Sequence, residues 1–402
     1  MYEQSGFQFD ISEVVYLLHL RVRRKHAQSY DIDCPFCGEN KGKLNVNLAK
    51  NVFRCNRCGE SGGMLDLYAK LYGVTTKEAN QQILEALNRG EFRDNYQKRV
   101  KETPAIVQSQ LAPEEAMDQT YSQMLSMLTL SKAHQEHLLG RGLTGKQISE
   151  LRYRSVPLFG VKNLVEGLIM KGCTIKGVPG FYRDVDGRWT INFTSHNSGI
   201  LIPIVSMEGK IQGFQIRVDH VTDDRKYIWL SSVNYNQGVS SGSPVHVIGN
   251  RNAKTVYLTE GALKGTIAHY LSGDTFVCVA GVNQYRNLKP VLEALQKQGT
   301  RFVIEAYDMD KKMQVICDHQ YHKCGKCAYP GKQNCHYKEE KRSIIQKGCR
   351  KAYEICKELS LPMSRMLWDT NQNGEWNGDI KGIDDLYVNQ KRKESVVRES
   401  KP

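Results

Sequence analysis

Eight of the twelve cysteines lie in two tight clusters, and the first cluster has the spacing of a metal site. Cys34 and Cys37 form one Cys-x2-Cys pair, and Cys55 and Cys58 form a second pair after 17 intervening residues. Two such pairs are typical of a structural Zn²⁺ ribbon, where four thiolates surround the ion and leave no position for a substrate. A redox pair and free thiols are the alternatives. We expect one structural zinc ion here.

A second cluster follows later in the chain, with the spacing Cys-x6-Cys-x2-Cys-x7-Cys. It comprises Cys317, Cys324, Cys327 and Cys335. These thiols could bind a second zinc ion, and the alternative is free thiols on an inserted loop.

Three carboxylates end two apolar runs and could form a catalytic metal site. Glu260 ends the run TVYLTEG, and Asp308 and Asp310 end the run RFVIEAYDMD. In a parallel sheet with helices, ligands gather at the carboxyl ends of the strands. Three carboxylates at one edge repel one another unless a divalent cation neutralises them. Mg²⁺ or Mn²⁺ held in this way is what phosphoryl transfer requires.

The order of apolar runs and helical patterns predicts the elements that would position these residues. Residues 254–390 alternate strand-like and helix-like segments, which predicts a parallel sheet covered by helices, so the fold class is mixed α/β. Residues 180–250 alternate short apolar runs with turns, which suggests hairpins. In the N-terminal region, Asp10 and Thr75 each begin a capping-box pattern that predicts a helix. Residues 44–47 and 52–55 are expected to be strands around the first cysteine cluster.

Two of these motifs resemble a known family. The stretch VFRCNRCGESGGMLDLYAKLYG around the ribbon resembles the zinc-binding domain of bacterial DnaG-type primases. In that family the ribbon contacts single-stranded template, which implies that Phe53, Arg54 and Arg57 bind nucleic acid. Aromatic faces stack on bases and cations meet phosphate. The alternative for Phe53 is that its ring packs beneath the zinc.

The Glu260-Gly261 pair, followed by Asp308-x-Asp310, resembles the toprim domain of primases, topoisomerases and related nucleases. The resemblance implies that these three acids hold catalytic magnesium. The segment KGIDD resembles a further acidic motif of such primases, so Asp384 and Asp385 are additional candidates for metal binding.

The middle of the chain resembles the start of the primase polymerising domain, in the segments HLLGRGLTGKQ and GILIPIVSMEGKIQGFQIRV. Matched motif by motif, Arg141, Arg217 and Lys226 would line the path of template or nucleotide. The alternative is that they are ordinary surface cations.

The predicted domain order combines these motifs. Residues 1–90 form the zinc ribbon, 91–118 a linker, and 119–250 the first part of a primase catalytic core. Residues 251–390 form a toprim-like domain with a Cys-rich insertion at 317–335, and 391–402 form a basic tail. The chain ends soon after Asp385, so we expect the helicase-binding domain of cellular primases to be missing, as in a phage or mobile-element version.

Composition limits the class of protein. The formal charge of +13 often reflects a polyanionic partner, although a generally basic surface would give the same sum. No run of about 18 apolar residues exists, so no membrane association is expected. The N-terminus has no signal-peptide pattern, and clustered cysteines are typical of a reducing compartment, so we expect a cytoplasmic protein.

Together these patterns predict a DNA primase, which synthesises short RNA primers on single-stranded DNA with structural zinc and catalytic Mg²⁺ or Mn²⁺. Its expected partners are single-stranded DNA, NTPs and a replicative helicase acting in trans. Two alternatives remain: a toprim-type metal-dependent nuclease, and a non-catalytic zinc-dependent DNA-binding replication protein. The presence of all three acids argues against the last of these.

Overall fold

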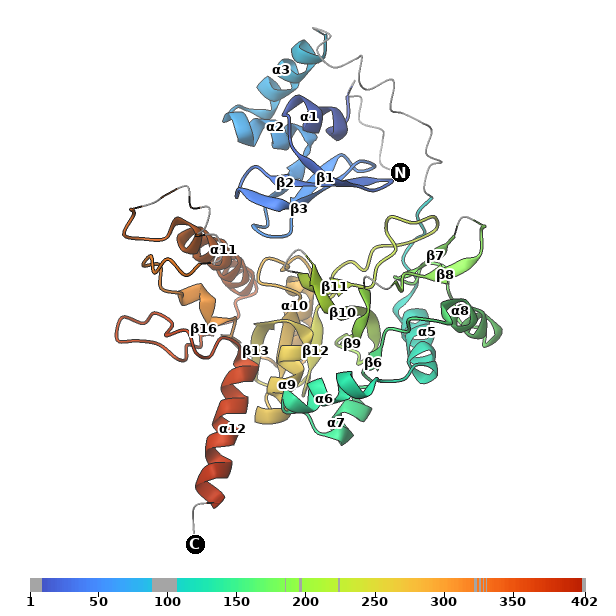
Figure 1. The fold of residues 1–402 in the computed structure, drawn as a ribbon, viewed down its shortest axis with the longest axis vertical. Helices are drawn as coiled ribbons and strands as arrows, with labels where there is room; N and C mark the ends of the chain where they lie inside the picture. Colours follow the sequence, from blue (N-terminus) through green and yellow to red (C-terminus); the bar gives the residue numbers. More distant parts are fainter. Residues whose placement is uncertain are drawn as a thin grey trace. The chain divides into compact units, whose positions relative to one another are not determined.

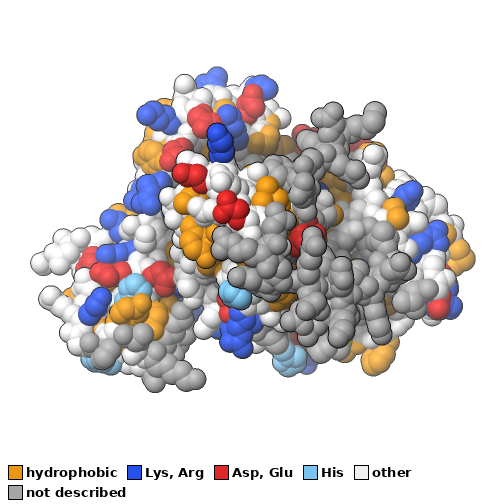
Figure 2. All heavy atoms as spheres, turned by 90° about the horizontal axis from the view of Figure 1, so that it is seen from above, with side chains coloured by type: hydrophobic (Ala, Val, Ile, Leu, Met, Phe, Trp, Pro, Cys, Tyr) orange, Lys and Arg blue, Asp and Glu red, His pale blue; other side chains and the backbone are white. Residues whose placement is uncertain are grey.

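The computed structural model describes residues 9–88 and 107–399, without 185, 195, 196, 223, 224, 322, 323, 325, 326, 328 and 330. The chain divides into two compact units, Met1–Val107 and Gln108–Pro402. On the face shown in Figure 2, basic and acidic side chains of the described residues are interspersed. Among the described helices, none is long and apolar enough to cross a bilayer.

The first unit is a five-stranded antiparallel sheet packed against three helices. Its strands follow one another in order as β1 (Val22–Lys25), β2 (Ser29–Cys34), β3 (Glu39–Asn47), β4 (Val52–Cys55) and β5 (Ser61–Gly63). The helices are α1 (Ile11–Leu17), α2 (Met64–Tyr72) and α3 (Thr76–Asn88). Asp10 and Glu13 form the predicted capping box of α1, and Glu78 bonds back to Thr75 before α3. The predicted strands and helices of this region are confirmed.

The second unit begins with helices that cover an antiparallel sheet. The helices are α5 (Glu114–Met127), α6 (Lys132–Gly140), α7 (Gly145–Glu150) and α8 (Val161–Met170). The sheet has the order β11-β10-β9-β6, with β6 (Arg154–Ser155), β9 (Gly199–Val205), β10 (Ile211–Thr222) and β11 (Arg225–Trp229). A separate hairpin joins β7 (Phe181–Arg183) to β8 (Trp189–Ile191). These are the hairpins that the sequence predicts.

Both faces of β9 are covered, which explains why its sequence is apolar throughout. Leu201 packs into a core with residues of α5 and α8, whereas Ile200 and Ile202 pack into a second core with residues of α6, α7 and α9. Successive side chains of a strand point to opposite faces, so an uninterrupted apolar strand indicates burial on both sides. The central strand therefore joins the two cores of this region.

The C-terminal sheet has the order β12-β14-β13-β15-β16. Strands β13 (Thr255–Glu260), β14 (Phe276–Val279), β15 (Phe302–Glu305) and β16 (Met363–Arg365) are parallel, and β12 (His246–Ile248) is an antiparallel edge. Its helices are α9 (Ala262–Ser272), α10 (Leu288–Lys297), the short 3-10 helix η2 (Met309–Lys312), α11 (His336–Glu358) and α12 (Ile383–Glu399). Helix α12 packs against α9 (Figure 1). The predicted parallel sheet is confirmed.

Two predicted boundaries differ from the structure. Helix α5 begins at Glu114, inside the expected linker 91–118, since two acidic residues follow Pro113 and suit the first turn of a helix. Helix α12 continues to Glu399, so most of the expected tail from residue 391 is helical. Of the predicted linker, residues 91–106 lie outside the described residues.

The close approach of α9 to β14 gives a stability prediction. A Cβ atom at Gly265 would lie 2.1 Å from the Sγ atom of Cys278, which is buried. We expect Gly265→Ala to destabilise the second unit by about 1–3 kcal/mol, the usual effect of overpacking a core. Thermal unfolding measures this change. Gly145→Ala is the control, because its added Cβ would meet no atom within 4 Å. Equal melting temperatures for the two variants would contradict the close packing.

Candidate functional site

The four cysteines of the first cluster converge in the structure. Their Sγ atoms all lie within 4.8 Å of one another, and those of Cys34 and Cys58 are 3.9 Å apart. A tetrahedral ion with Zn–S bonds of about 2.3 Å separates its sulfurs by roughly 3.8 Å. The backbone N–H groups of Arg57 and Cys58 donate to Cys55 Sγ, at 3.4 and 3.5 Å. Such donors favour the thiolate form that binds metal, so the donor set fits structural zinc.

The structure corrects one predicted nucleic-acid contact in this unit. Phe53 is only 1% exposed, and its ring stacks on that of Phe36 with centroids 5.5 Å apart. A ring buried in this way has no face left for a base, so Phe53 packs in the core of the ribbon. Arg54 and Arg57 are half-buried, and their predicted contacts with phosphate remain proposals.

The predicted catalytic acids meet at the carboxyl edge of the parallel sheet. Glu260 is the last residue of β13, and Asp308 follows the adjacent parallel strand β15 and precedes η2. Gly261 links β13 to α9 with a φ of +84°, a conformation that residues with a side chain rarely adopt. This explains why glycine follows the glutamate. Asp308 and Asp310 are buried, and Glu260 is half-buried.

Three lysines surround these acids. Lys264 pairs with Asp308 and lies 3.7 Å from Glu260 Oε1. Lys381 Nζ lies 3.3 Å from Asp308 Oδ2 and 3.0 Å from Asp310 Oδ2. Lys341 Nζ lies 3.1 Å from the same oxygen of Asp310. Each acid therefore has at least one ammonium group beside it. The oxygens of these carboxylates converge less closely than the sulfurs of the zinc ribbon.

Burial and these charges set the protonation of the acids. Burial and the charge of Asp308 raise the pKa of Glu260 to about 7, although Lys264 acts in the opposite direction. Burial would also raise the pKa of Asp308, but the ammonium groups of Lys264 and Lys381 outweigh it and hold that pKa below its usual range. Two neighbouring carboxylates in different environments thus differ in their readiness to ionise.

A buried ion cluster supports the turn that carries Asp308 and Asp310. Lys311 is 1% exposed, and its Nζ donates to Glu305 Oε1 at 2.5 Å and to the Tyr307 carbonyl at 2.8 Å. Arg365 Nε donates to the other oxygen of Glu305, also at 2.5 Å. Trp368 lies beneath the ammonium, 5.4 Å from Nζ to the ring centroid. Lys311 therefore ties the backbone of the acidic turn to the end of β15.

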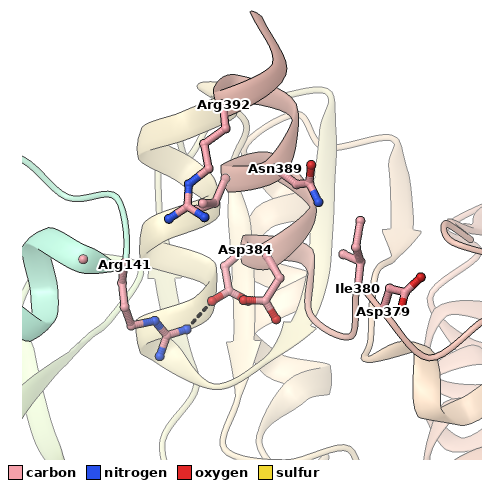
Figure 3. A pocket seen from close by; sticks show the side chains of 9 residues that line it. Arg141, Asp379, Ile380, Asp384, Asn389 and Arg392 are labelled. Carbon is pink, nitrogen blue, oxygen red and sulfur yellow. Dashed lines mark hydrogen bonds and ion pairs between the residues drawn. The ribbon is translucent and has the colours of Figure 1, made fainter. Parts of the chain in front are cut away.

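The third acidic motif lies in a neighbouring hollow. Asp384 and Asp385 occupy the first turn of α12, beside a hollow of ≈ 390 Å³ that Arg141 and Arg392 also line. Figure 3 shows the Arg141 guanidinium directed at Asp384, with which it forms an ion pair. Burial raises the pKa of Asp384 despite Arg141, and its Oδ1 has no hydrogen-bond partner among the described residues. Arg141 thus pairs with an acid of the same compact unit.

The other predicted cations do not gather in one place. Arg141 and Arg217 both lower the pKa of His137, after the larger effect of burial, so both lie near that ring. Arg217 on β10 pairs in register with Tyr227 on β11. Lys226 precedes Tyr227 in the strand, so its side chain leaves the opposite face of the sheet. The side chains of Arg217 and Tyr227 thus leave one face of the sheet, and that of Lys226 leaves the other.

Sequence reasoning missed the lysines of the site. Lys264 follows Glu260 by four residues and lies in the first turn of α9, directly after the strand end that carries the acid. That signal could have been recognised. Lys341 lies far along the chain from the acids on α11, and no pattern in the sequence connects it to Asp310.

Loss of zinc ligands gives a prediction for the first unit. We expect Cys37→Ser/Cys58→Ser to remove one zinc ion per chain and to unfold the ribbon, because metal binding supplies folding free energy in so small a core. Metal analysis of the full chain and limited proteolysis of residues 9–88 measure the two effects. Cys173→Ser is the control, since Cys173 lies outside both clusters. A protease-resistant ribbon without zinc would contradict the assignment.

The buried cluster behind the acids gives a second prediction. Replacing Lys311 by Met leaves Glu305 buried with one charge partner fewer, and breaking a buried pair typically costs about 3–5 kcal/mol. We expect a clear fall in the melting temperature of Lys311→Met. Lys312→Met is the matched control, because Lys312 is adjacent and half-buried. Similar melting temperatures for the two variants would show that the ion cluster contributes little.

Comparison with known proteins agrees with the zinc site. Residues 2–99 match the family model described as the CHC2 zinc finger, the zinc ribbon of DnaG. A DNA primase of Thermotoga maritima is 23% identical over 229 residues, which cover 53% of this chain and 35% of the relative. A DNA primase of Listeria monocytogenes is 23% identical over 216 residues, covering 51% and 33%. The matched region thus spans about a third of the length of these curated relatives.

Solved structures of primases also align with the chain. The zinc-binding and RNA polymerase domains of Aquifex aeolicus primase align with 97% of this chain and 82% of their own, with 16% identity and a TM-score of 0.45. A DnaG primase catalytic domain bound to single-stranded DNA aligns with 72% of this chain and 82% of its own, with 13% identity and a TM-score of 0.42. The chain thus carries a zinc ribbon of the DnaG type at residues 2–99 and is similar to bacterial DNA primases over about half of its length.

Proposed function

We propose that this chain synthesises short RNA primers on single-stranded DNA by divalent-metal-dependent nucleotidyl transfer. The observation that carries the proposal is the meeting of Glu260, Asp308 and Asp310 at the carboxyl edge of a parallel sheet. The relation to DNA primases supports the choice of reaction. The cytoplasmic location and a helicase partner in trans remain expectations from the sequence.

The donor set fits a hard divalent cation. Its groups are carboxylate oxygens, which Mg²⁺ and Mn²⁺ prefer, and half-buried Glu260 leaves the site accessible. A bound cation would orient the triphosphate and stabilise the charge that develops on it. It would compete with the Lys264 ammonium for the oxygens of Glu260 and Asp308. Asp384 and Asp385 are proposed as more distant members of the acidic site, since Arg141 already neutralises Asp384.

The lysines suit a polyanionic substrate. Lys264, Lys341 and Lys381 bring three positive charges to three carboxylates. A divalent cation among the acids would leave an excess of positive charge, which attracts the phosphates of a nucleotide and of a primer strand. The primer 3′-hydroxyl oxygen then bonds to the α-phosphorus while the bond to pyrophosphate breaks. The hydroxyl proton passes to solvent, and pyrophosphate leaves with the electron pair.

Substitution of the acids tests the proposal. We expect Asp308→Asn and Asp310→Asn to reduce primer synthesis by roughly two orders of magnitude or more, because positioning and charge stabilisation provide most of the catalysis. Labelled NTPs on a single-stranded DNA template report the activity, and fluorescence anisotropy reports DNA binding. The affinity for DNA should change little, because DNA binding depends on cationic side chains and not on these acids. Asp186→Asn is the control, since Asp186 is exposed on the β7–β8 hairpin.

The same assay separates the alternatives. Parental activity in both acid variants would contradict the proposed site. A parent protein that shortens the DNA without making primers would be a toprim-type nuclease. A parent that binds single-stranded DNA and catalyses neither reaction would be a non-catalytic replication protein.

A further inference from the structure

The second cysteine cluster lies on an insertion between η2 and α11, and two of its members are held by a short antiparallel backbone pair. Ile316 and Asn334 form the bridge of this pair. Cys317 N donates to the Gln333 carbonyl at 3.0 Å, and Cys335 N donates to the Val315 carbonyl at 2.7 Å. Cys317 and Cys335 each follow one bridge partner, so their side chains leave the same face of the pair. Residues far apart in the insertion thus present two thiols together.

The other two thiols lie on a tight turn. Cys324 N donates to the Tyr321 carbonyl at 2.8 Å, and Cys327 N donates to the Cys324 carbonyl at 3.2 Å. Tyr329 N donates to Cys327 Sγ at 3.4 Å. The zinc ribbon has the same feature, because Arg57 N donates to Cys55 Sγ at 3.4 Å from the same position, two residues after the cysteine. A backbone donor aimed at the sulfur fixes the orientation of the side chain, as hydrogen bonds to metal ligands commonly do.

Ring contacts hold the two halves of the cluster next to each other. The ring of Tyr329, two residues after Cys327, packs 4.1 Å from that of His336, which directly follows Cys335. The sulfurs are less converged than those of the ribbon, where all four lie within 4.8 Å. Thiolates without an ion between them repel one another, and metal binding supplies the free energy that draws such ligands together.

We propose that Cys317, Cys324, Cys327 and Cys335 bind a second structural Zn²⁺ ion. Four thiolates select a soft or borderline ion such as zinc over Mg²⁺ and close its tetrahedral shell. His319 Nδ1 lies 3.8 Å from Cys317 Sγ. The ion does not depend on the proposed primer synthesis.

The ion would fix the segment that begins α11. Cys335 is the residue immediately before this helix, and Arg342 on its second turn donates to the Met313 carbonyl at 3.1 Å. Lys341, the preceding residue, lies beside Asp310. A metal that holds Cys335 to the insertion would therefore hold a lysine of the acidic site in position. The role is structural, because all four ligands come from the protein.

The zinc content of the full chain tests this inference. Purified under reducing conditions, the parent should contain two zinc ions per chain by elemental mass spectrometry. Cys324→Ser/Cys327→Ser should contain one, and so should Cys37→Ser/Cys58→Ser, which keeps the second cluster intact. Cys173→Ser should retain two. These zinc counts do not depend on catalysis, so they test the second site independently of the proposed primer synthesis.

The parent count decides the matter even where a variant fails to fold. One zinc ion per chain in the parent would overturn the second site, as would two ions in Cys324→Ser/Cys327→Ser. Mass spectrometry of the alkylated parent provides an independent outcome. A disulfide between Cys324 and Cys327 under reducing conditions would overturn the proposal, whereas four thiols protected from alkylation until a chelator is added would support it.

Discussion

Mutual repulsion between carboxylates is the constraint on which the structure of the second unit depends. Glu260 and Asp308 end adjacent parallel strands, and Asp310 follows in the next turn, so the fold itself forces negative charges together. Removing them from water without cations would be strongly unfavourable. Elements distant in the sequence therefore contribute compensating charges: Lys264 from α9, Lys341 from α11 and Lys381 from the segment before α12. The negative charge at the sheet edge is balanced because these elements converge on it.

The same constraint explains the second layer of charge behind the acids. Glu305 is the last residue of β15, shortly before the acidic turn, and it is fully buried. Lys311 and Arg365 are its charge partners. Buried pairs contribute little net stability compared with apolar side chains of the same size. Their value here is geometric, because Lys311 also bonds to the Tyr307 and Met366 carbonyls and so fixes the backbone on both sides of the turn. The acids are held by a rigid support.

Local sequence patterns predicted much of this structure, whereas contacts between residues far apart in the chain could not be predicted from them. The capping residues Asp10 and Thr75, the two Cys-x2-Cys pairs and the alternating segments after residue 254 each act over a few residues, and the sequence shows them directly. Phe53 shows the limit of such patterns. From the sequence, an aromatic ring beside the ribbon could stack on a base or pack in the core, and only its 1% exposure in the structure shows that it packs in the core. The pairing of Arg141 with Asp384 joins residues with no shared motif.

The ion pair between Arg141 and Asp384 also has a consequence for how the chain is made. Its partners are separated by 243 positions. Arg141, directly after α6, therefore leaves the ribosome long before Asp384, which neutralises it. The zinc ribbon, by contrast, has all four ligands within residues 34–58 and can close early. Domains form largely in the order of synthesis, and contacts of high sequence separation form late. The nascent chain would thus carry a folded ribbon while its second unit still lacks α12.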